Sequence, residues 1–286
     1  MVHRILIVTA VAAEADSVSA GLGLGGAELL PLPGGLVLRR HSDAPGDGPA
    51  GSPDDRSTGA GSAGDGSTGS PGARLRVDVL VGGVGPAAVA ASTGTALAYA
   101  ALTDPPGPSG PSGSGSPYDL VVSAGIAGGF QPLAPLGSVV VSSAVVAADL
   151  GAQTPDGYLT IDELGFGRSV HPVPEALTGR IAAALAAAGR PHTVAPVLTV
   201  STVTGTAGRA AELAGLRPGA AAEAMEGFGV AEAAAGYAVP VVEIRAVSNA
   251  VGPRDRAAWR IGEALEALRH TFELLGKTVF LELEPS

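Results

Sequence analysis

Residues 221–249 constrain the fold of this chain most, because they combine an alanine-rich run with a run of strand-forming residues. The run at residues 225–235 is rich in alanine, the best helix former, and Gly236 after it tolerates the left-handed conformation in which helices often end. Residues 239–247 are rich in β-branched side chains and apolar on both faces, which is typical of a parallel strand covered by helices. The segment therefore predicts a helix that leads into a buried strand of an α/β sheet.

Polar residues inside this segment are the first candidates for a functional site. Glu226 opens the predicted helix in an apolar context, and a carboxylate buried there is costly without a dedicated partner, such as a pair of ligand hydroxyl groups. Ser248 and Asn249 follow the predicted strand, and α/β sheets usually bind ligands at the carboxyl ends of their strands. Each placement also has a structural interpretation, with Glu226 as a carboxylate favoured by the helix dipole and Asn249 as a turn residue.

Glu14 is a third candidate, because it follows a predicted buried strand at residues 4–10. Its carboxylate reaches the same edge of the sheet as Asn249 if the two strands are parallel. The alternative is a carboxylate in the first turn of a helix, paired with the helix dipole.

Strand and helix patterns alternate along the whole chain. Arg74, Arg76 and Asp78 alternate with apolar residues, which indicates a strand with one exposed face near its start. Strands are predicted at residues 4–10, 36–40, 74–83, 118–123, 137–148, 194–203 and 239–247, and helices at residues 86–102, 174–188, 225–235 and 256–275. This order favours an α/β fold, with three α/β/α layers around a central mixed, largely parallel sheet.

The fold is expected to be a single domain over residues 1–286, interrupted by low-complexity inserts at residues 42–73 and 104–117. The first insert contains no Leu, Ile, Val, Phe or Tyr. It cannot bury enough apolar surface to offset the entropy lost on ordering, so it is predicted to be dispensable.

Two glycine-rich segments follow predicted strands. The amides of Gly82 and Gly83 precede a predicted helix, where backbone N–H groups can bind an anion or a sugar hydroxyl. The segment is not a Walker loop, because no Gly-Lys-Ser/Thr follows it, and it lacks the third glycine of the dinucleotide-binding fingerprint. Residues 124–130 hold three glycines, which either let a flat ring approach the backbone closely or form a tight turn.

The composition excludes several classes of function. A formal net charge of -10 argues against a nucleic-acid-binding surface. The chain has no cysteine and its five histidines lack the spacing of metal ligands, so no metal and no cofactor are predicted. Residues 5–13 weakly imitate a signal peptide but also fit a buried first strand, so a cytoplasmic protein without a membrane span is expected.

Taken together, the motifs resemble those of the purine nucleoside phosphorylase and nucleosidase superfamily, and above all its futalosine hydrolase branch. The resemblance rests on AEAMEGFG at residues 222–229, EIRAVSNAVGPRDR at residues 243–256 and SAGIAGGF at residues 123–130. It extends along the chain apart from the two inserts. It implies a nucleoside phosphorylase-like fold, a homo-oligomer and a small-molecule purine nucleoside as substrate.

The resemblance also implies a role for each candidate. Glu14, Glu226 and Asn249 are the expected catalytic residues. Glu14 holds and activates the attacking water, Glu226 holds the ribose hydroxyls together with Met225, and Asn249 meets the purine together with Ser248. The other residues expected to bind substrate are those of the glycine-rich segments, namely Gly82, Gly83, Ala127, Gly128, Gly129 and Phe130.

Asn249 departs from the adenine-specific nucleosidases, which have Asp at this position. A 6-oxopurine presents two acceptors, to which the amide of Asn can donate and an ionised Asp cannot, although Asn can also pair with adenine. The difference favours hypoxanthine as the leaving base. The expected reaction is hydrolysis of futalosine to hypoxanthine and dehypoxanthine futalosine, a step of menaquinone biosynthesis. The alternatives are a purine nucleoside phosphorylase, a methylthioadenosine/adenosylhomocysteine-type nucleosidase and a non-catalytic nucleoside-binding protein.

Overall fold

The computed structural model describes residues 2–42, 74–103 and 116–283. Its strands are β1 (Val2–Thr9), β2 (Glu28–Pro31), β3 (Val37–Ser42), β4 (Arg74–Val81), β5 (Leu120–Gly129), β6 (Val139–Ala147), β7 (Gly151–Thr154), β8 (Gly157–Thr160), β9 (Val170–Pro172), β10 (His192–Thr199), β11 (Ala222–Ala224) and β12 (Val241–Ala250). Its α-helices are α1 (Ala12–Leu22), α2 (Pro86–Thr103), α3 (Glu175–Ala187), α4 (Ala207–Leu216), α5 (Gly227–Gly236) and α6 (Ile261–Gly276).

A mixed sheet organises these elements, with its strands in the order β11-β10-β6-β12-β5-β1-β4-β3-β2. The four strands β4, β1, β5 and β12 are parallel to one another, whereas β6 runs antiparallel to β12, and β3 and β2 add antiparallel pairings at one edge. The end of β5 also pairs with β11, so that β5, β12, β6, β10 and β11 close into a ring.

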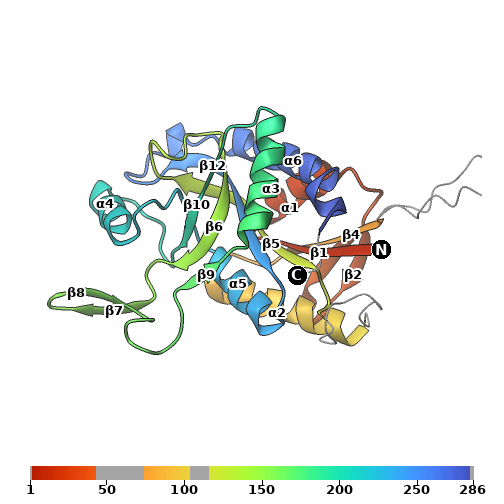
Figure 1. The fold of residues 1–286 in the computed structure, drawn as a ribbon, viewed down its shortest axis with the longest axis horizontal. Coiled ribbons are helices and arrows are strands. Elements are labelled where there is room, and N and C mark those ends of the chain that lie inside the picture. The colour runs from red at the N-terminus through yellow and green to blue at the C-terminus, as the bar shows by residue number, and fades with distance from the viewer. Residues whose placement is uncertain (1, 43–73, 104–115, 284–286) are drawn as a thin grey trace, which may run out of the picture.

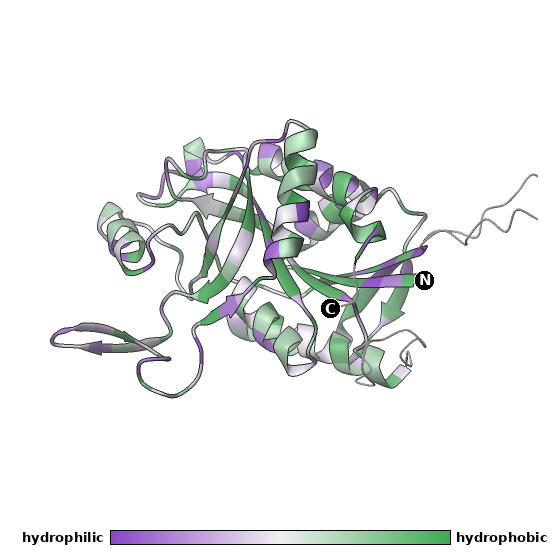
Figure 2. Cartoon of the chain, viewed as in Figure 1, coloured by the Kyte–Doolittle hydropathy of each residue, from purple (hydrophilic) through white to green (hydrophobic). Residues whose placement is uncertain are grey.

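Helices cover both faces of the sheet, which confirms the predicted three-layer arrangement. Figure 1 shows α1, α3 and α6 on one side and α2 and α5 on the other, and the apolar colouring of the central strands in Figure 2 marks the layer between them. The ring has an apolar cluster of its own, to which every one of its strands contributes small residues: Ala127, Val140, Val197, Ala222 and Val247. Small side chains suit this interior because a closed ring leaves little room inside.

Two strands continue further than the sequence predicts, and this places five candidate site residues inside strands, namely Ala127, Gly128, Gly129, Ser248 and Asn249. Asn249 lies within β12, so its predicted place past the end of that strand is wrong. Gly128 and Gly129 lie within β5, so they do not form a turn. The physical reason is pairing, since Gly128 is opposite Asn249 on one side and the same end of β5 pairs with β11 on the other.

Asp78 corrects a second prediction, because it does not lie on an exposed face. Its side chain is fully buried, and its carboxylate accepts two hydrogen bonds of 2.9 Å from the guanidinium of Arg40. The hydroxyl of Tyr118 donates a third bond, of 2.7 Å. A charge with these partners can be buried, which alternation of residue types along a strand does not reveal.

Other boundaries also differ from the predictions. The last helix begins at Ile261, after a short 3₁₀ turn at Arg256–Ala258, and residues 149–167, where no strand is predicted, contain the β7–β8 hairpin. The sequence did not predict β2, β9, β11 or α4. Except for their ends, the proposed inserts lie outside the described residues, and the single-domain organisation of residues 1–286 stays a prediction.

Candidate functional site

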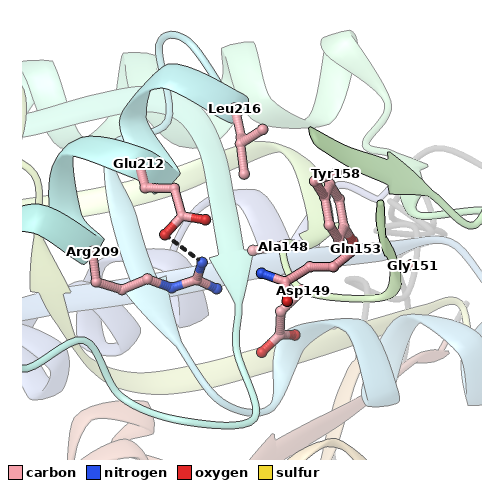
Figure 3. A pocket seen from close by; sticks show the side chains of 8 residues that line it. All are labelled: Ala148, Asp149, Gly151, Gln153, Tyr158, Arg209, Glu212 and Leu216. Atoms are coloured by element: carbon pink, nitrogen blue, oxygen red, sulfur yellow. Dashed lines mark ion pairs between the residues drawn. The ribbon is translucent and has the colours of Figure 1, made fainter. Parts of the chain in front are cut away.

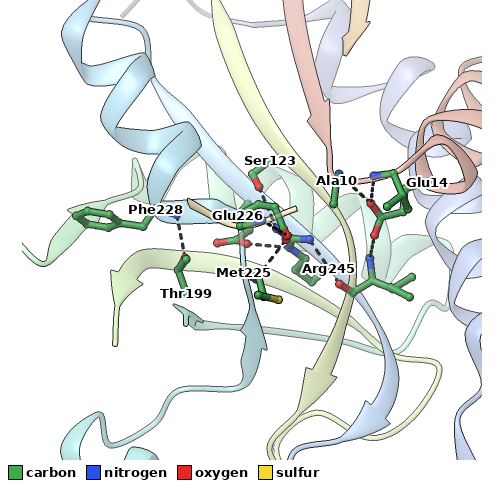
Figure 4. Close-up of polar contacts among 12 residues, drawn as sticks. Ala10, Glu14, Ser123, Thr199, Met225, Glu226, Phe228 and Arg245 are labelled. Atoms are coloured by element: carbon green, nitrogen blue, oxygen red, sulfur yellow. Dashed lines mark hydrogen bonds and ion pairs between the residues drawn. The ribbon is translucent and has the colours of Figure 1, made fainter. Parts of the chain in front are cut away.

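Glu14 lies in the first turn of α1, just past the carboxyl end of β1, and only 3% of it is exposed. One carboxylate oxygen accepts hydrogen bonds from the backbone N–H groups of Ala10 (2.9 Å) and Val11 (3.3 Å). The other oxygen accepts a bond of 2.9 Å from the N–H of Ile126 in β5. Three backbone donors, two from the β1–α1 connection and one from β5, therefore hold this carboxylate in one orientation (Figure 4).

Glu226 lies directly before α5 and is also buried. Its Oε1 accepts a hydrogen bond from the N–H of Gly85 (3.3 Å), and its Oε2 accepts one from the N–H of Met225 (3.2 Å). The same Oε2 forms an ion pair of 3.2 Å with Nη2 of Arg245. The glycine turn after β4 and the strand β12 thus both position this carboxylate.

Arg245 lies between the carboxylates of Glu14 and Glu226. Its guanidinium is buried and pairs with Glu243 through a 2.8 Å contact in addition to Glu226, while Nη2 donates to the hydroxyl of Ser123 at 3.2 Å. Burial by itself lowers the pKa of Arg245. The carboxylates of Glu243, Glu226 and Glu14 outweigh burial and raise that pKa above its ordinary value, so the guanidinium stays charged.

Gly125 in β5 lets these charged groups approach one another. A Cβ atom added at this position would lie 2.5 Å from Oε1 of Glu14 and 2.6 Å from Nη1 of Arg245. No side chain fits between those two groups, so the close approach of Glu14 to Arg245 requires glycine here. Gly125 belongs to the site although it was not among the predicted site residues.

The glycine turn after β4 contributes differently from the prediction. Gly85 supplies the amide that reaches Glu226, whereas the expected Gly82 directs its N–H to the carbonyl of Thr9 at 2.8 Å. A Cβ atom at Gly82 would lie 2.9 Å from the side chains of both Val8 and Ser92, so this glycine serves the packing of α2 on the sheet. Gly83 and Gly85 have positive φ angles of 94° and 93°, which favour glycine.

Ser248 and Asn249 lie on β12, beside the glycine-rich end of β5. The hydroxyl of Ser248 donates a 2.8 Å hydrogen bond to Oδ1 of Asn249, and the backbone carbonyl of Ala127 lies 3.3 Å from the same hydroxyl. With Oδ1 accepting from Ser248, the NH₂ group of Asn249 is the end that remains for donation, and it now contacts the carbonyl of Ala250 at 3.0 Å. A Cβ atom at Gly128 would lie 3.2 Å from that NH₂ group.

Met225 and Phe130 share an apolar cluster next to these polar groups. Phe130 is buried in it, and the partly buried Met225 packs against it together with Val251. The structure therefore brings together the expected Glu14, Met225, Glu226, Ser248, Asn249 and the segment 127–130, and it adds Arg245, Gly125 and Gly85. Of these, Arg245 carried a signal in the sequence, namely a charged residue inside an apolar strand.

A cavity of about 230 Å³ lies elsewhere, between α4 and the β7–β8 hairpin (Figure 3). Arg209 and Glu212 in its lining form an ion pair of 2.9 Å with each other. None of the predicted site residues lines this cavity or the adjoining one of about 370 Å³, whose lining includes Arg217. In the described parts of the chain, no group of three or more His, Asp or Glu side chains is placed to hold a metal ion.

A model of the phosphorylase superfamily matches residues 52–279 of the chain. The chain is 61% identical over 191 residues to the futalosine hydrolase of Streptomyces coelicolor. This alignment covers 67% of this chain and 74% of that protein. It is 39% identical over 275 residues to the futalosine hydrolase of Acidothermus cellulolyticus, covering 95% of this chain and 89% of that protein.

Solved structures share the fold at low identity. The 5'-methylthioadenosine/S-adenosylhomocysteine nucleosidase of Helicobacter pylori, in complex with butyl-thio-DADMe-Immucillin-A, matches with a TM-score of 0.69 and 16% identity, over 98% of both chains. The native futalosine hydrolase of the same organism matches with a TM-score of 0.67 and 16% identity, over 97% of both chains. The predicted nucleoside phosphorylase-like fold is confirmed.

Proposed function

The chain belongs to the phosphorylase superfamily, and from this premise we propose that it hydrolyses the N-glycosidic bond of futalosine, releasing hypoxanthine and dehypoxanthine futalosine. The two relatives that support this reaction are both futalosine hydrolases, and one of them aligns with 95% of the chain. The observation that carries the proposal in the structure is the pair of buried carboxylates, Glu14 and Glu226, on either side of Arg245.

Breaking a glycosidic bond places positive charge on the sugar and negative charge on the departing base. Around Arg245 the carboxylates of Glu14, Glu226 and Glu243 outnumber the single guanidinium, so the field favours a cationic sugar. Groups held this firmly need little reorganisation as that charge develops.

Glu14 is proposed to hold and activate the attacking water. A carboxylate has about four acceptor positions, and the three backbone N–H groups leave one for water. Because those donors also fix its orientation, the water would be held at a defined place beside the sugar.

Glu226 is proposed to hold the ribose hydroxyls. Its contacts with Gly85, Met225 and Arg245 likewise leave acceptor capacity on the carboxylate. The apolar side chain of Met225 lies directly beside it and packs in the cluster that contains Phe130, which suits the apolar face of a sugar.

Asn249 is proposed to donate to the departing base from its NH₂ group. The bond from Ser248 to Oδ1 supports this orientation, and two acceptors on the edge of hypoxanthine match a donor there. The segment 127–130 is proposed to border the same purine, because Ala127 to Gly129 in β5 pair with the part of β12 that contains Asn249.

The ion pairs of Arg245 favour hydrolysis over phosphorolysis. A phosphorylase needs free cationic side chains to bind phosphate, and Arg245 is already committed to Glu243 and Glu226. The carboxylate of Glu14, near the position of the nucleophile, would repel a phosphate ion.

The experiment is to incubate the purified protein with futalosine, inosine or methylthioadenosine in phosphate-free buffer and to follow free base by chromatography. Hypoxanthine released from futalosine alone is the expected result. Release that requires added phosphate, or that occurs from methylthioadenosine instead, would overturn the proposal.

The homo-oligomer, the cytoplasmic location and the role in menaquinone biosynthesis stay predictions. The exposed apolar side chains of Leu159 (37%) and Phe166 (80%), on and after the β7–β8 hairpin, support an interface between copies of the chain. Light scattering on the purified protein tests this. No helix within the described residues combines the length and apolar character needed to cross a bilayer.

A further inference from the structure

A short loop between β12 and α6 gathers arginines around the only tryptophan of the chain. We call residues 254–260 the arginine loop. The guanidinium carbon of Arg254 lies 5.4 Å from the centre of the Trp259 ring, and that of Arg256 lies 5.6 Å from it. Two cations next to one indole ring form a compact, positively charged aromatic surface.

The side chains of Arg254 and Arg256 are both exposed. Neither forms an ion pair with any residue that the structure describes, whereas Arg260 pairs with Glu263 at 3.3 Å. The nearby Asp255 uses its carboxylate to accept a hydrogen bond from the N–H of Ala257. In a chain with a formal net charge of -10, these two exposed guanidinium groups are available to bind an anion.

The arginine loop lies at the same end of the molecule as the catalytic carboxylates. The N–H of Arg260 donates a 2.8 Å hydrogen bond to the carbonyl of Ser248, the neighbour of Asn249. Strands β1 and β12 run parallel, α1 follows β1 and α6 follows β12, and both helices lie on the same side of the sheet (Figure 1). Both helices therefore begin at the same edge of the sheet, where the first turn of α1 contains Glu14.

Exposed apolar side chains lie at the starts of these two helices. Val11, which precedes α1, and Ile261, which opens α6, are each 42% exposed. Exposed apolar side chains next to two guanidinium groups suit an apolar or aromatic chain that ends in an anion.

We propose that the arginine loop binds an anionic group that the nucleoside carries beyond the 5′ carbon of its ribose. This inference rests on the proposed function, which assigns the purine to Asn249 and the ribose hydroxyls to Glu226 and leaves the 5′ end as the part without a partner. Arg254 and Arg256 donate paired N–H groups to the anion, and the face of Trp259 packs against the chain that carries it.

The test measures binding in a Glu14→Gln background, so that no substrate is consumed. Futalosine, inosine and inosine 5′-monophosphate share hypoxanthine and ribose and differ in the 5′ group, which is a chain ending in a benzoate, a hydroxyl and a phosphate respectively. Calorimetric titrations compare the background protein with one that also carries Arg254→Gln and Arg256→Gln. The matched control carries Arg209→Gln and Arg269→Gln, which remove the same charge from exposed ion pairs elsewhere.

The arginine-loop variant is expected to bind futalosine about tenfold or more weakly, because two charge-assisted contacts are lost, and to bind inosine within about twofold of the background. The difference should shrink in high salt. If inosine 5′-monophosphate alone loses affinity, the anion is a phosphate. Equal effects on all three ligands, or none, would overturn the inference. A wild-type protein that binds futalosine through these arginines but releases no hypoxanthine would overturn the proposed function alone.

Discussion

The Nη2 atom of Arg245 lies 3.2 Å from Oε2 of Glu226, and both side chains are almost completely buried. The same guanidinium binds Glu243 at 2.8 Å. Arg245 therefore has two effects, since it allows a carboxylate to be buried beside the ribose position and it fixes the direction in which that carboxylate points.

Replacing Arg245 tests the first effect. Arg245→Met leaves Glu226 and Glu243 buried without their cation, and removing one partner of a buried ion pair typically costs about 3–5 kcal/mol. The free energy of unfolding, measured in urea, should fall by that amount. Arg269→Met, which breaks an exposed pair with Glu266, should change it by less than about 1 kcal/mol. Equal losses in the two variants would contradict this assignment.

Glu14→Gln tests the proposed base. The substitution preserves shape but removes the negative charge and places an NH₂ group opposite backbone N–H donors. Loss of a general base typically lowers the rate about 10²- to 10⁴-fold. We expect kcat for futalosine to fall by that factor, while Glu212→Gln on α4, outside the site, leaves it unchanged. A Glu14→Gln protein that retains more than about a third of the wild-type kcat would exclude this role.

Gly125→Ala tests the close approach of Glu14 and Arg245. The new Cβ atom would lie 2.5 Å from Glu14 and 2.6 Å from Arg245, so both side chains must shift and activity should fall at least about tenfold, since displacements near 1 Å can cost up to 10²-fold. Gly94→Ala, in α2, meets no atom within 4 Å and should stabilise the protein by up to about 1 kcal/mol, since alanine favours helices. Full activity in Gly125→Ala would show that the approach is not needed.

Asn249→Asp tests the choice of base. The substitution replaces the donor NH₂ with a carboxylate oxygen, and a good pair of contacts to one base edge is worth about 1–3 kcal/mol. We expect kcat/KM for futalosine to fall about 10- to 100-fold, with hypoxanthine affinity falling in parallel. Rates of hypoxanthine and adenine release from futalosine and methylthioadenosine provide the measurement. An unchanged ratio of the two rates would show that Asn249 does not select the base.

Local patterns in the sequence were sufficient to predict the long strands and helices, but not β2, β9, β11 or α4. Apolar β-branched runs and alanine-rich runs each have a short-range physical cause, so the parallel centre of the sheet and its helical covering could be predicted. The predicted family was also correct, because its motifs, such as the one around Met225 and Glu226, are contiguous in the chain.

The closure of β5 onto β11 could not be read from the chain, because it pairs glycines at residues 128–129 with residues about 95 positions later. That closure extends β5 and β12 and places Asn249 inside a strand. For the same reason the partners of Arg245 and Asp78 appeared only in three dimensions, since residues that neutralise a buried charge come from distant segments. Residue types and local spacing therefore specify which elements form and which chemical groups the chain offers. Long-range packing specifies which of those groups meet, since a contact between distant segments depends on every element that lies between them.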